Sequence, residues 1–207
     1  MNNFDFNKVV ENFAEIGLQH QMQLCERFQL GKDINEVGSA MVKFMRCYLG
    51  DKPLQKHEAY AEIADWLHDS KGKGLYLYGL CSQGKTFMAR YVIPAMFHHY
   101  HNRILHFYPM TEVNNKLDEV LRQHCIVLDD VGTEEQLVSF GQRRNAFDEI
   151  MDAVEQKGKL VIITTNLTKE QIEDRYGTRT YERIKATTRR IVFNKRDTDN
   201  HPVSFRE

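Results

Sequence analysis

The 207-residue chain is long enough to bury one good core, because 42% of its residues are hydrophobic. Its length favours one domain with a short appendage over two domains. Lys and Arg number 28 and Asp and Glu number 29, which gives a net charge of -1. A near-neutral chain has no global basic field to attract nucleic acid, so a local patch would have to bind any such partner.

Cysteine spacing and the N-terminus exclude several other classes. The four cysteines, which are Cys25, Cys47, Cys81 and Cys125, form no CxxC pair, so the sequence suggests neither a zinc site nor a disulfide framework. The N-terminus lacks a basic stretch followed by an apolar run, and no window comes near the roughly 18 apolar residues of a membrane helix. We therefore expect a soluble, cytoplasmic protein with no membrane partner.

The first part of the chain has a helical pattern. Apolar residues recur at helical spacing from Asn7 to about Tyr48, and a turn signal at Gly31–Asp33 interrupts them. The pattern therefore predicts two helices.

A break at Gly50–Pro53 marks the predicted domain boundary. We expect a helical N-terminal segment over residues 1–53, which is a candidate partner-binding region. The second region, residues 54–207, opens with a predicted helix over Lys56–Trp66.

From Gly74 onward, short apolar runs alternate with stretches that suit helices. The runs are rich in Ile, Leu, Val and Tyr, and they are too short to be helices alone. Their spacing leaves room for crossover helices, which predicts an α/β fold with a five-stranded, mostly parallel sheet between helices. Pro94 is expected to kink or shorten the helix after the first run. The runs are Leu75–Tyr78, Ile104–Tyr108, Cys125–Leu128, Leu160–Ile163 and Ile191–Phe193.

The first run leads directly into a glycine-rich loop with the P-loop spacing G-x-x-x-x-G-K-[ST]. Its glycines let backbone N–H groups point inward, and the following helix adds partial positive charge at its N-terminus. Lys85 can bridge the β- and γ-phosphates of ATP, and the Thr86 hydroxyl can bind Mg²⁺. The predicted cofactors are therefore ATP and Mg²⁺. The predicted cofactor-binding residues are Gly79, Leu80, Cys81, Ser82, Gln83, Gly84, Lys85 and Thr86.

Two carboxylates, Asp129 and Asp130, close the third apolar run. At the carboxyl edge of a parallel sheet they would lie beside the P-loop. We interpret Asp129 as a Mg²⁺ residue together with Thr86, and Asp130 as the base that orients the attacking water. Alone, a D-D-x-G sequence would indicate a turn after a strand. The P-loop upstream in the same sheet favours the functional interpretation.

The fourth run turns polar at Thr164, Thr165 and Asn166. A neutral amide there can hydrogen-bond both the γ-phosphate and the attacking water. Asn166 could equally be the N-cap or turn residue before a helix that begins near Thr168. Both interpretations stay open.

Between residues 175 and 196, eight cations face the single acid Glu182. Three of them, at i, i+4 and i+8, share one face of any continuous helix, although Gly177 can interrupt it. The stretch could be a solvated surface, could supply an arginine to a neighbouring subunit, or could contact nucleic-acid phosphates. The cations are Arg175, Arg179, Arg183, Lys185, Arg189, Arg190, Lys195 and Arg196.

Over roughly residues 55 to 195 the chain resembles the DnaC/IstB-type AAA+ ATPases, which include replicative-helicase loaders and transposition helper proteins. The resemblance rests on KGLYLYGLCSQGKT, CIVLDDVG, VIITTN, and YGTRTYERI followed by RRIVFN. It implies an AAA+ core with Walker A at 79–86, Walker B at Asp129 and Asp130, sensor 1 at Asn166, and an arginine finger within Tyr176–Ile184, where Arg183 is the first candidate and Arg179 the second.

The chain departs from the family pattern at three places. The family usually has glycine in place of Ser82 and glycine or threonine in place of Gln83. Between Tyr108 and Cys125 there is room for only one short helix, whereas the family commonly has a longer insertion that helps to form a single-stranded DNA channel. The N-terminal residues match no partner-binding domain.

The leading functional hypothesis is an ATPase that resembles a helicase loader, assembles head to tail with itself, and acts on a replicative helicase, another protein or single-stranded DNA. Its catalytic residues would be Asp130, Asn166 and Arg183. The alternative is a nucleotide-gated adaptor that binds a protein partner with little or no ATP turnover. A P-loop kinase is disfavoured, because the acidic pair and the polar strand end suit hydrolysis.

Overall fold

The computed structural model describes residues 25–54, 57–135, 137–139 and 142–193, and the first predicted helix, near Asn7, lies outside them. Five strands form one sheet in the order β2-β3-β6-β1-β7, and all four pairings are parallel. The fold class expected from the sequence is confirmed. The strands are β1 (Gly74–Gly79), β2 (His106–Pro109), β3 (Cys125–Val131), β6 (Leu160–Thr165) and β7 (Thr188–Phe193).

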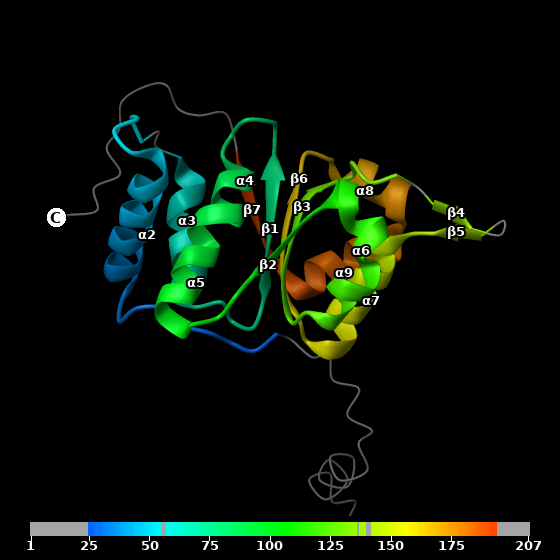
Figure 1. The fold of residues 1–207 in the computed structure, drawn as a ribbon, viewed down its shortest axis with the longest axis horizontal. Coiled ribbons are helices and arrows are strands. Elements are labelled where there is room, and N and C mark those ends of the chain that lie inside the picture. The colour runs from blue at the N-terminus through cyan, green and yellow to red at the C-terminus, as the bar shows by residue number, and fades with distance from the viewer. Residues whose placement is uncertain (1–24, 55–56, 136, 140–141, 194–207) are drawn as a thin grey trace, which may run out of the picture.

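Figure 1 shows the sheet edge-on between two groups of helices. One face is covered by α2 (Ile34–Leu49), α3 (Glu58–His68), α4 (Lys85–Phe87), the π-helical turn η1 (Met88–Val92) and α5 (Ile93–His101). The other face is covered by α6 (Met110–Arg122), α7 (Ala146–Lys157), α8 (Lys169–Tyr176) and α9 (Thr178–Thr187).

Alternation along each strand supplies both cores. Within β3, Val127 joins the core under α5, whereas Ile126 and Leu128 join the core under α6 and α7. Successive side chains of a strand point to opposite faces, so a sheet covered on both sides needs apolar residues at nearly every position. The same alternation in β1 and β6 explains why short, uninterrupted apolar runs were the correct strand signal.

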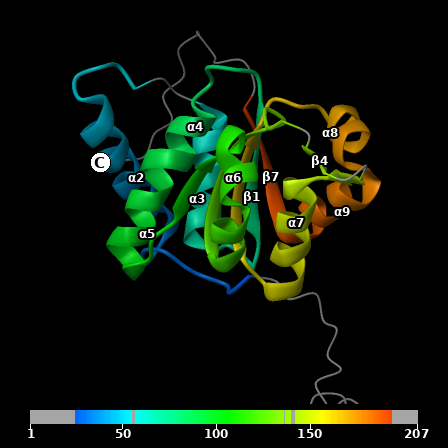
Figure 2. The same cartoon turned by 45° about the vertical axis from the view of Figure 1, so that its right-hand side comes forward.

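Helix α2 begins at the N-cap Asp33, whose carboxylate accepts hydrogen bonds from the backbone N–H groups of Asn35 and Glu36. Its buried residues pack into the same core as α3 and α5. Figure 2 shows α2 and α5 on the same side of the sheet. Residues 25–49 thus pack on the rest of the described chain, and the boundary after residue 53 stays a prediction.

Two local features follow from chain chemistry. The helix after the P-loop contains a π-helical turn, η1, directly before Pro94, where the proline lacks the N–H that an α-helix requires. The sequence pattern did not predict the antiparallel pair β4 (Leu137–Ser139) and β5 (Gln142–Arg144). In Figure 1 this pair projects from the side of the sheet that α6, α7, α8 and α9 cover. In the part of the chain that the structure describes, no helix is both long and apolar enough to cross a membrane.

Lys159 closes the end of α6 from the neighbouring strand connection. Its side chain is buried, and its ammonium donates hydrogen bonds to the carbonyls of Leu121 at 2.5 Å and Gln123 at 2.8 Å. Burial lowers the pKa of this ammonium from its ordinary value. These bonds satisfy carbonyls at a helix end that would otherwise lack donors.

We expect Lys159→Met to lower the free energy of unfolding by about 1 to 3 kcal/mol, because two carbonyls lose a charged donor while the apolar volume is kept. Urea denaturation measures the change. Lys157→Met, at the exposed last residue of α7, is the matched control and should be nearly neutral. Equal stability of the two variants would contradict this role of Lys159.

Candidate functional site

The candidate site lies where three neighbouring strands end. Strand β6 lies between β3 and β1 in the sheet, so their carboxyl ends meet at one edge. Ligands of open parallel sheets bind outside this edge. The P-loop follows β1, the acidic pair closes β3, and Asn166 directly follows β6.

The loop begins at a glycine that has no room for a side chain. Gly79 has φ 152°, and a Cβ there would lie 2.2 Å from the carbonyl oxygen of Phe193 on β7. This close approach of two strand ends explains the first glycine of the motif.

Both residues that depart from the DnaC/IstB-type loop cost free energy, one through its backbone conformation and the other through a buried polar atom. Ser82 adopts a left-handed conformation with φ 63°, which for an L-residue costs roughly 1 to 2 kcal/mol. Glycine, the usual family residue here, would avoid it. Gln83 is buried, and its Oε1 has no hydrogen-bond partner among the described residues. Leaving such an atom unpaired costs roughly 1 to 3 kcal/mol.

The Lys85 ammonium forms no ion pair with a carboxylate among the described residues. Its Nζ donates to the carbonyls of Gly79 at 2.8 Å and Leu80 at 2.7 Å, and to Asn166 Oδ1 at 2.8 Å. Burial lowers the pKa of this ammonium, and Cys81 and the two aspartates oppose the shift. A buried ammonium with only neutral acceptors favours an anion beside it.

Asn166 connects this ammonium to the acidic pair. Its Oδ1 accepts from Lys85, and its Nδ2 donates to Asp130 Oδ1 at 3.1 Å. The orientation of the amide is fixed, because an ammonium only donates and a carboxylate only accepts. The N-cap of α8 is instead Thr168, which forms a capping box with Gln171. The N-cap interpretation of Asn166 was therefore wrong, although that residue does follow the strand as predicted.

A β-bulge turns both aspartates toward the loop. Leu128 pairs with Ile163 and Val131 with Thr165, so Asp129 and Asp130 together oppose the single residue between those partners on β6. Asp130 has φ 62°, a conformation that aspartate tolerates better than most residues. In a regular strand the two carboxylates would point to opposite faces, and a bulge re-aims them.

The metal-binding residues predicted from the sequence are brought together. Asp129 Oδ1 accepts from the Thr86 hydroxyl at 2.9 Å and from the Thr164 hydroxyl at 2.7 Å. Carboxylate and hydroxyl oxygens are the donors that Mg²⁺ prefers, and Mg²⁺ is usually held by few protein ligands plus phosphates. No group of three or more His, Cys, Asp or Glu side chains among the described residues forms a cage. The donor set therefore fits Mg²⁺ bound together with a phosphate.

The site encloses a cavity of about 400 Å³ that receives most of the predicted residues. Sequence reasoning did not assign Thr164 or Phe87, which also line it. The polar end of β6 was the available signal for Thr164. The lining residues are Cys81, Ser82, Gln83, Gly84, Lys85, Thr86, Phe87, Asp130, Thr164 and Asn166.

Comparison with known proteins gives a match in fold. The solved structure of the DnaC helicase loader matches with a TM-score of 0.55 and 22% identity, and the match covers 70% of this chain and 95% of that chain. The chain has a DnaC-like AAA+ fold. The structure of DnaI matches with a TM-score of 0.47 and 19% identity, covering 81% of this chain and 88% of that one.

The sequence comparisons are narrower. A family model described as RNA helicase matches residues 75–167, which run from β1 through the P-loop to the end of β6. No curated protein sequence matches the chain. The resemblance to DnaC-type AAA+ proteins is confirmed for the fold by the structural match.

Arg183, the first finger candidate, is not among the residues that line the P-loop cavity of its own chain. It is buried on α9, where its guanidinium pairs with Glu155 at 2.9 Å and also with Asp152, both on α7. Arg179 is exposed near the start of α9 and has no ion pair among the described residues. Gly177 separates α8 from α9, so Arg175 and the two later arginines do not share one continuous helix.

Most other cations of the basic stretch have a partner within the chain. Lys185 pairs with Glu182 at 3.0 Å and Arg189 with Asp65 at 2.6 Å. The Arg190 guanidinium lies 5.0 Å from the ring centre of Tyr78. Lys185 and Arg190 are nevertheless exposed, and Lys195 and Arg196 lie outside the described residues.

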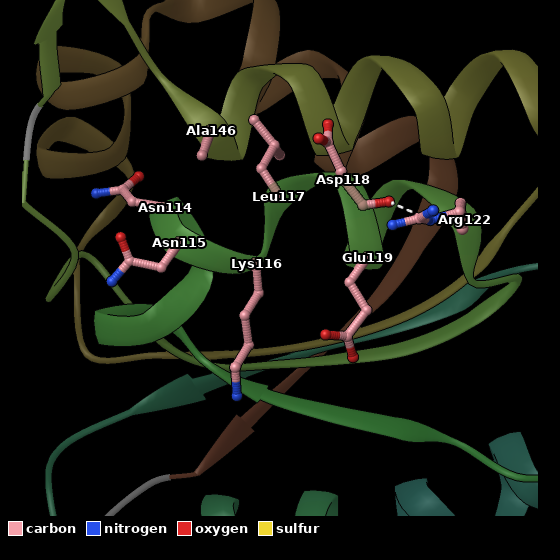
Figure 3. A pocket seen from close by; sticks show the side chains of 8 residues that line it. All are labelled: Asn114, Asn115, Lys116, Leu117, Asp118, Glu119, Arg122 and Ala146. Atoms are coloured by element: carbon pink, nitrogen blue, oxygen red, sulfur yellow. Dashed lines mark hydrogen bonds between the residues drawn. The ribbon is translucent and has the colours of Figure 1, made fainter.

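A second cavity, of about 270 Å³, lies along α6 (Figure 3). Its two cations have partners on the same helix: Lys116 pairs with Glu112 at 2.7 Å, and Arg122 donates to the Asp118 carbonyl at 3.0 Å. Such pairs stabilise an exposed helix. The cavity lacks the strand ends and the buried ammonium of the P-loop site.

We expect Lys85→Ala to weaken binding of MgATP by about 10- to 100-fold, because a charged hydrogen-bond donor is removed from the anion site. Isothermal calorimetry measures the affinity. Lys116→Ala, which removes an exposed ammonium from α6, is the control and should bind like the wild type. Equal affinities of the Lys85 variant and the wild type would refute the site.

Proposed function

We propose that this chain binds ATP with Mg²⁺ and hydrolyses it, as an AAA+ protein similar to a helicase loader. The observation that carries the proposal is the chain of contacts from Lys85 through Asn166 to Asp130, with Asp129 and Thr86 beside it. It supplies an ammonium for phosphate, oxygen donors for a metal and a carboxylate for water. Those are the elements that phosphoryl transfer to water requires.

Each residue has a separate task in the proposed reaction. Bound MgATP supplies the phosphoryl group that is transferred to water. Lys85 would neutralise phosphate charge, and Thr86 and Asp129 would hold the metal. Asp130 accepts the proton of the attacking water or orients it, while the Asn166 amide fixes the Asp130 carboxylate. Asn166 would thereby hold Lys85, at the phosphate end of the site, and Asp130, the proposed base, in fixed positions.

Hydrolysis also requires a cation that Lys85 alone does not supply. An arginine finger is worth roughly 10³- to 10⁵-fold in rate where one acts. We propose that an arginine of α9 enters the site of a neighbouring copy, in a head-to-tail assembly that forms a ring or a helix. The sequence favours Arg183, but its pairing with Glu155 and Asp152 supports the exposed Arg179 instead.

The partner is proposed from the likeness to DnaC, which is a helicase loader. By analogy, this chain would act in DNA replication or transposition, on a replicative helicase or another protein, with single-stranded DNA as a further candidate partner. If DNA binds through cations, affinity should fall with salt in proportion to the phosphates neutralised.

One observation favours a second candidate function, the nucleotide-gated adaptor with little turnover. Ser82 is in a left-handed conformation, and Gln83 carries a buried, unpaired oxygen. Both costs lie in the loop that is proposed to hold the phosphates. Tight ATP binding without phosphate release, with or without single-stranded DNA, would support the adaptor.

We expect Asp130→Asn to keep ATP affinity and to reduce hydrolysis by roughly 10²- to 10⁴-fold, because the base is lost while an amide can still bond Asn166. Phosphate release and calorimetry measure the two quantities. An unchanged rate would mean that Asp130 only closes the strand.

We expect mixtures of Arg179→Ala and Asp130→Asn to recover part of the activity that each variant lacks alone. An interface that joins an intact Asp130 site to an intact Arg179 donor would be active, and activity per chain should also rise with protein concentration. The same mixture made with Arg183→Ala tests the first candidate. If both mixtures stay inactive while all variants bind ATP and assemble, neither arginine acts between subunits.

A further inference from the structure

A buried carboxylate lies four residues beyond Asp130, and the proposed reaction does not use it. The Glu134 side chain is only 4% exposed. Its Oε2 accepts from the Gly132 N–H at 3.0 Å, while its Oε1 accepts from Arg175 Nε at 3.3 Å and from the Tyr176 hydroxyl. An acid this deeply buried is stable only when its oxygens are bonded, and here both are.

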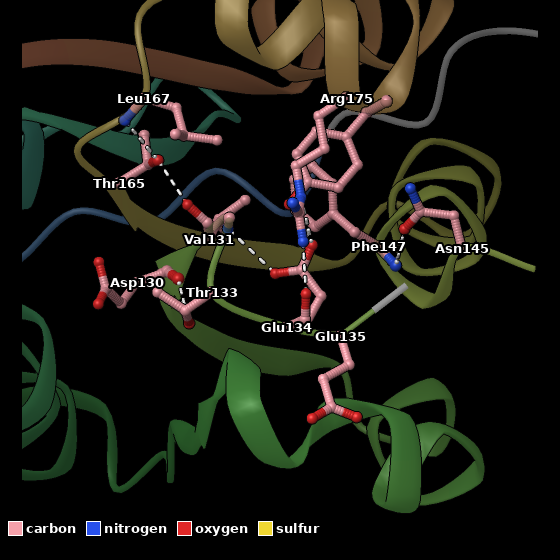
Figure 4. A network of polar contacts seen from close by, with 12 residues as sticks. Asp130, Val131, Thr133, Glu134, Glu135, Asn145, Phe147, Thr165, Leu167 and Arg175 are labelled. Carbon is pink, nitrogen blue, oxygen red and sulfur yellow. Dashed lines mark hydrogen bonds and ion pairs between the residues drawn. The ribbon is translucent and has the colours of Figure 1, made fainter. Parts of the chain in front are cut away.

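On one side, Glu134 holds the turn that follows Asp130 (Figure 4). Gly132 has φ 110° and packs against Leu167, so closely that a Cβ would lie 2.5 Å from Leu167 Cδ1. The Thr133 hydroxyl donates to the Asp130 carbonyl at 2.8 Å. The conformation of this turn therefore sets the direction of the Asp130 backbone, and Glu134 closes it.

On the other side, Glu134 holds the end of α8. Arg175 donates to both the side chain and the backbone carbonyl of Glu134. The ring of Tyr176 packs against Phe147 with ring centres 4.7 Å apart. Burial and the bond to Glu134 raise the pKa of the Tyr176 hydroxyl, so it remains a donor to this carboxylate. Tyr176 is the last residue of α8. Gly177 follows it, and the exposed Arg179 lies in the first turn of α9.

Glu134 thus joins two parts of the molecule that are far apart in sequence. One contains the base of the proposed reaction, and the other is the α8–α9 corner that presents Arg179. A carboxylate that only filled space could be replaced by an apolar group at little cost. An acid bonded at the same time to the Asp130 turn and to Arg175 instead fixes their relative position.

We propose that Glu134 is a positioning residue that locks the Asp130 turn to the α8–α9 corner, so that the nucleotide at Asp130 and the arginine at the corner are set together. The inference rests on the proposed ATPase function. It assigns a role to a residue outside the P-loop motif and the acidic pair. Because misplacement of a catalytic group by about 1 Å can cost about 100-fold, turnover should depend on Glu134.

The test compares four variants of the full chain. Glu134→Ala removes all the side-chain contacts, and Glu134→Gln keeps the shape but loses the charge that faces Arg175. Tyr176→Phe removes one hydroxyl while its ring stays packed. Glu135→Ala, at the exposed neighbouring position, is the matched control. Calorimetry gives ATP affinity, phosphate release gives kcat, and thermal unfolding reports folding.

We expect Glu134→Ala to lower kcat by about 10- to 100-fold while ATP affinity stays within about threefold of the wild type. Glu134→Gln and Tyr176→Phe should lie in between, and Glu135→Ala should match the wild type. Equal kcat in all folded variants would overturn the inference, and so would parallel losses of affinity and stability. If Glu134→Ala does not fold, Tyr176→Phe decides by the same criterion.

Hydrogen exchange gives a readout that needs no turnover. In the wild type, MgATP should slow exchange both in residues 130–135 and in the first turn of α9. In Tyr176→Phe or Glu134→Ala, the response of α9 should be lost while that of the turn remains. An α9 response that persists would refute the coupling. A wild-type chain that binds no ATP would instead refute the proposed function, and the inference with it.

Discussion

The β-bulge at the end of β3 is the constraint on which the candidate site depends. Two residues, Asp129 and Asp130, occupy the space opposite Thr164, and the Asp130 N–H donates to the Thr164 hydroxyl at 2.8 Å. That hydroxyl must then donate to Asp129. One threonine therefore fixes the backbone of one aspartate and the carboxylate of the other. Without the bulge only one of them would face the P-loop.

The bulge also determines how charge is distributed across the site. The Asn166 amide donates to the Asp130 carboxylate and accepts from the Lys85 ammonium, so one neutral group separates the two charges. A direct ion pair would have neutralised the ammonium. The intervening amide instead leaves Lys85 with neutral partners among the described residues, and such a charge favours a bound anion.

Sequence reasoning succeeded where the signal was local and failed where tertiary contacts decide. The P-loop spacing and the apolar strands placed Lys85 and Asp129 at one sheet edge, because parallel strands bring their carboxyl ends together. The bulge left no periodic signal, since Asp-Asp after a strand reads equally well as a turn. Glu134 was missed because its partners on α8 are about forty residues away. Arg183 was favoured on the family resemblance, and its carboxylate partners on α7 are visible only in the fold.

The pairing of the arginines within the chain bears on the proposed contact with a second copy. Within the described residues, Arg175, Arg183 and Arg189 are each paired with a carboxylate, and such pairing costs a guanidinium its freedom to meet phosphate. Lys85 is the only cation among the described residues that line the cavity. In enzymes that use an arginine finger, the finger stabilises transition-state charge that one ammonium and a metal ion leave unbalanced. In the proposed head-to-tail assembly, Arg179, which is exposed near the start of α9, would meet that charge in the nucleotide site of a neighbouring copy.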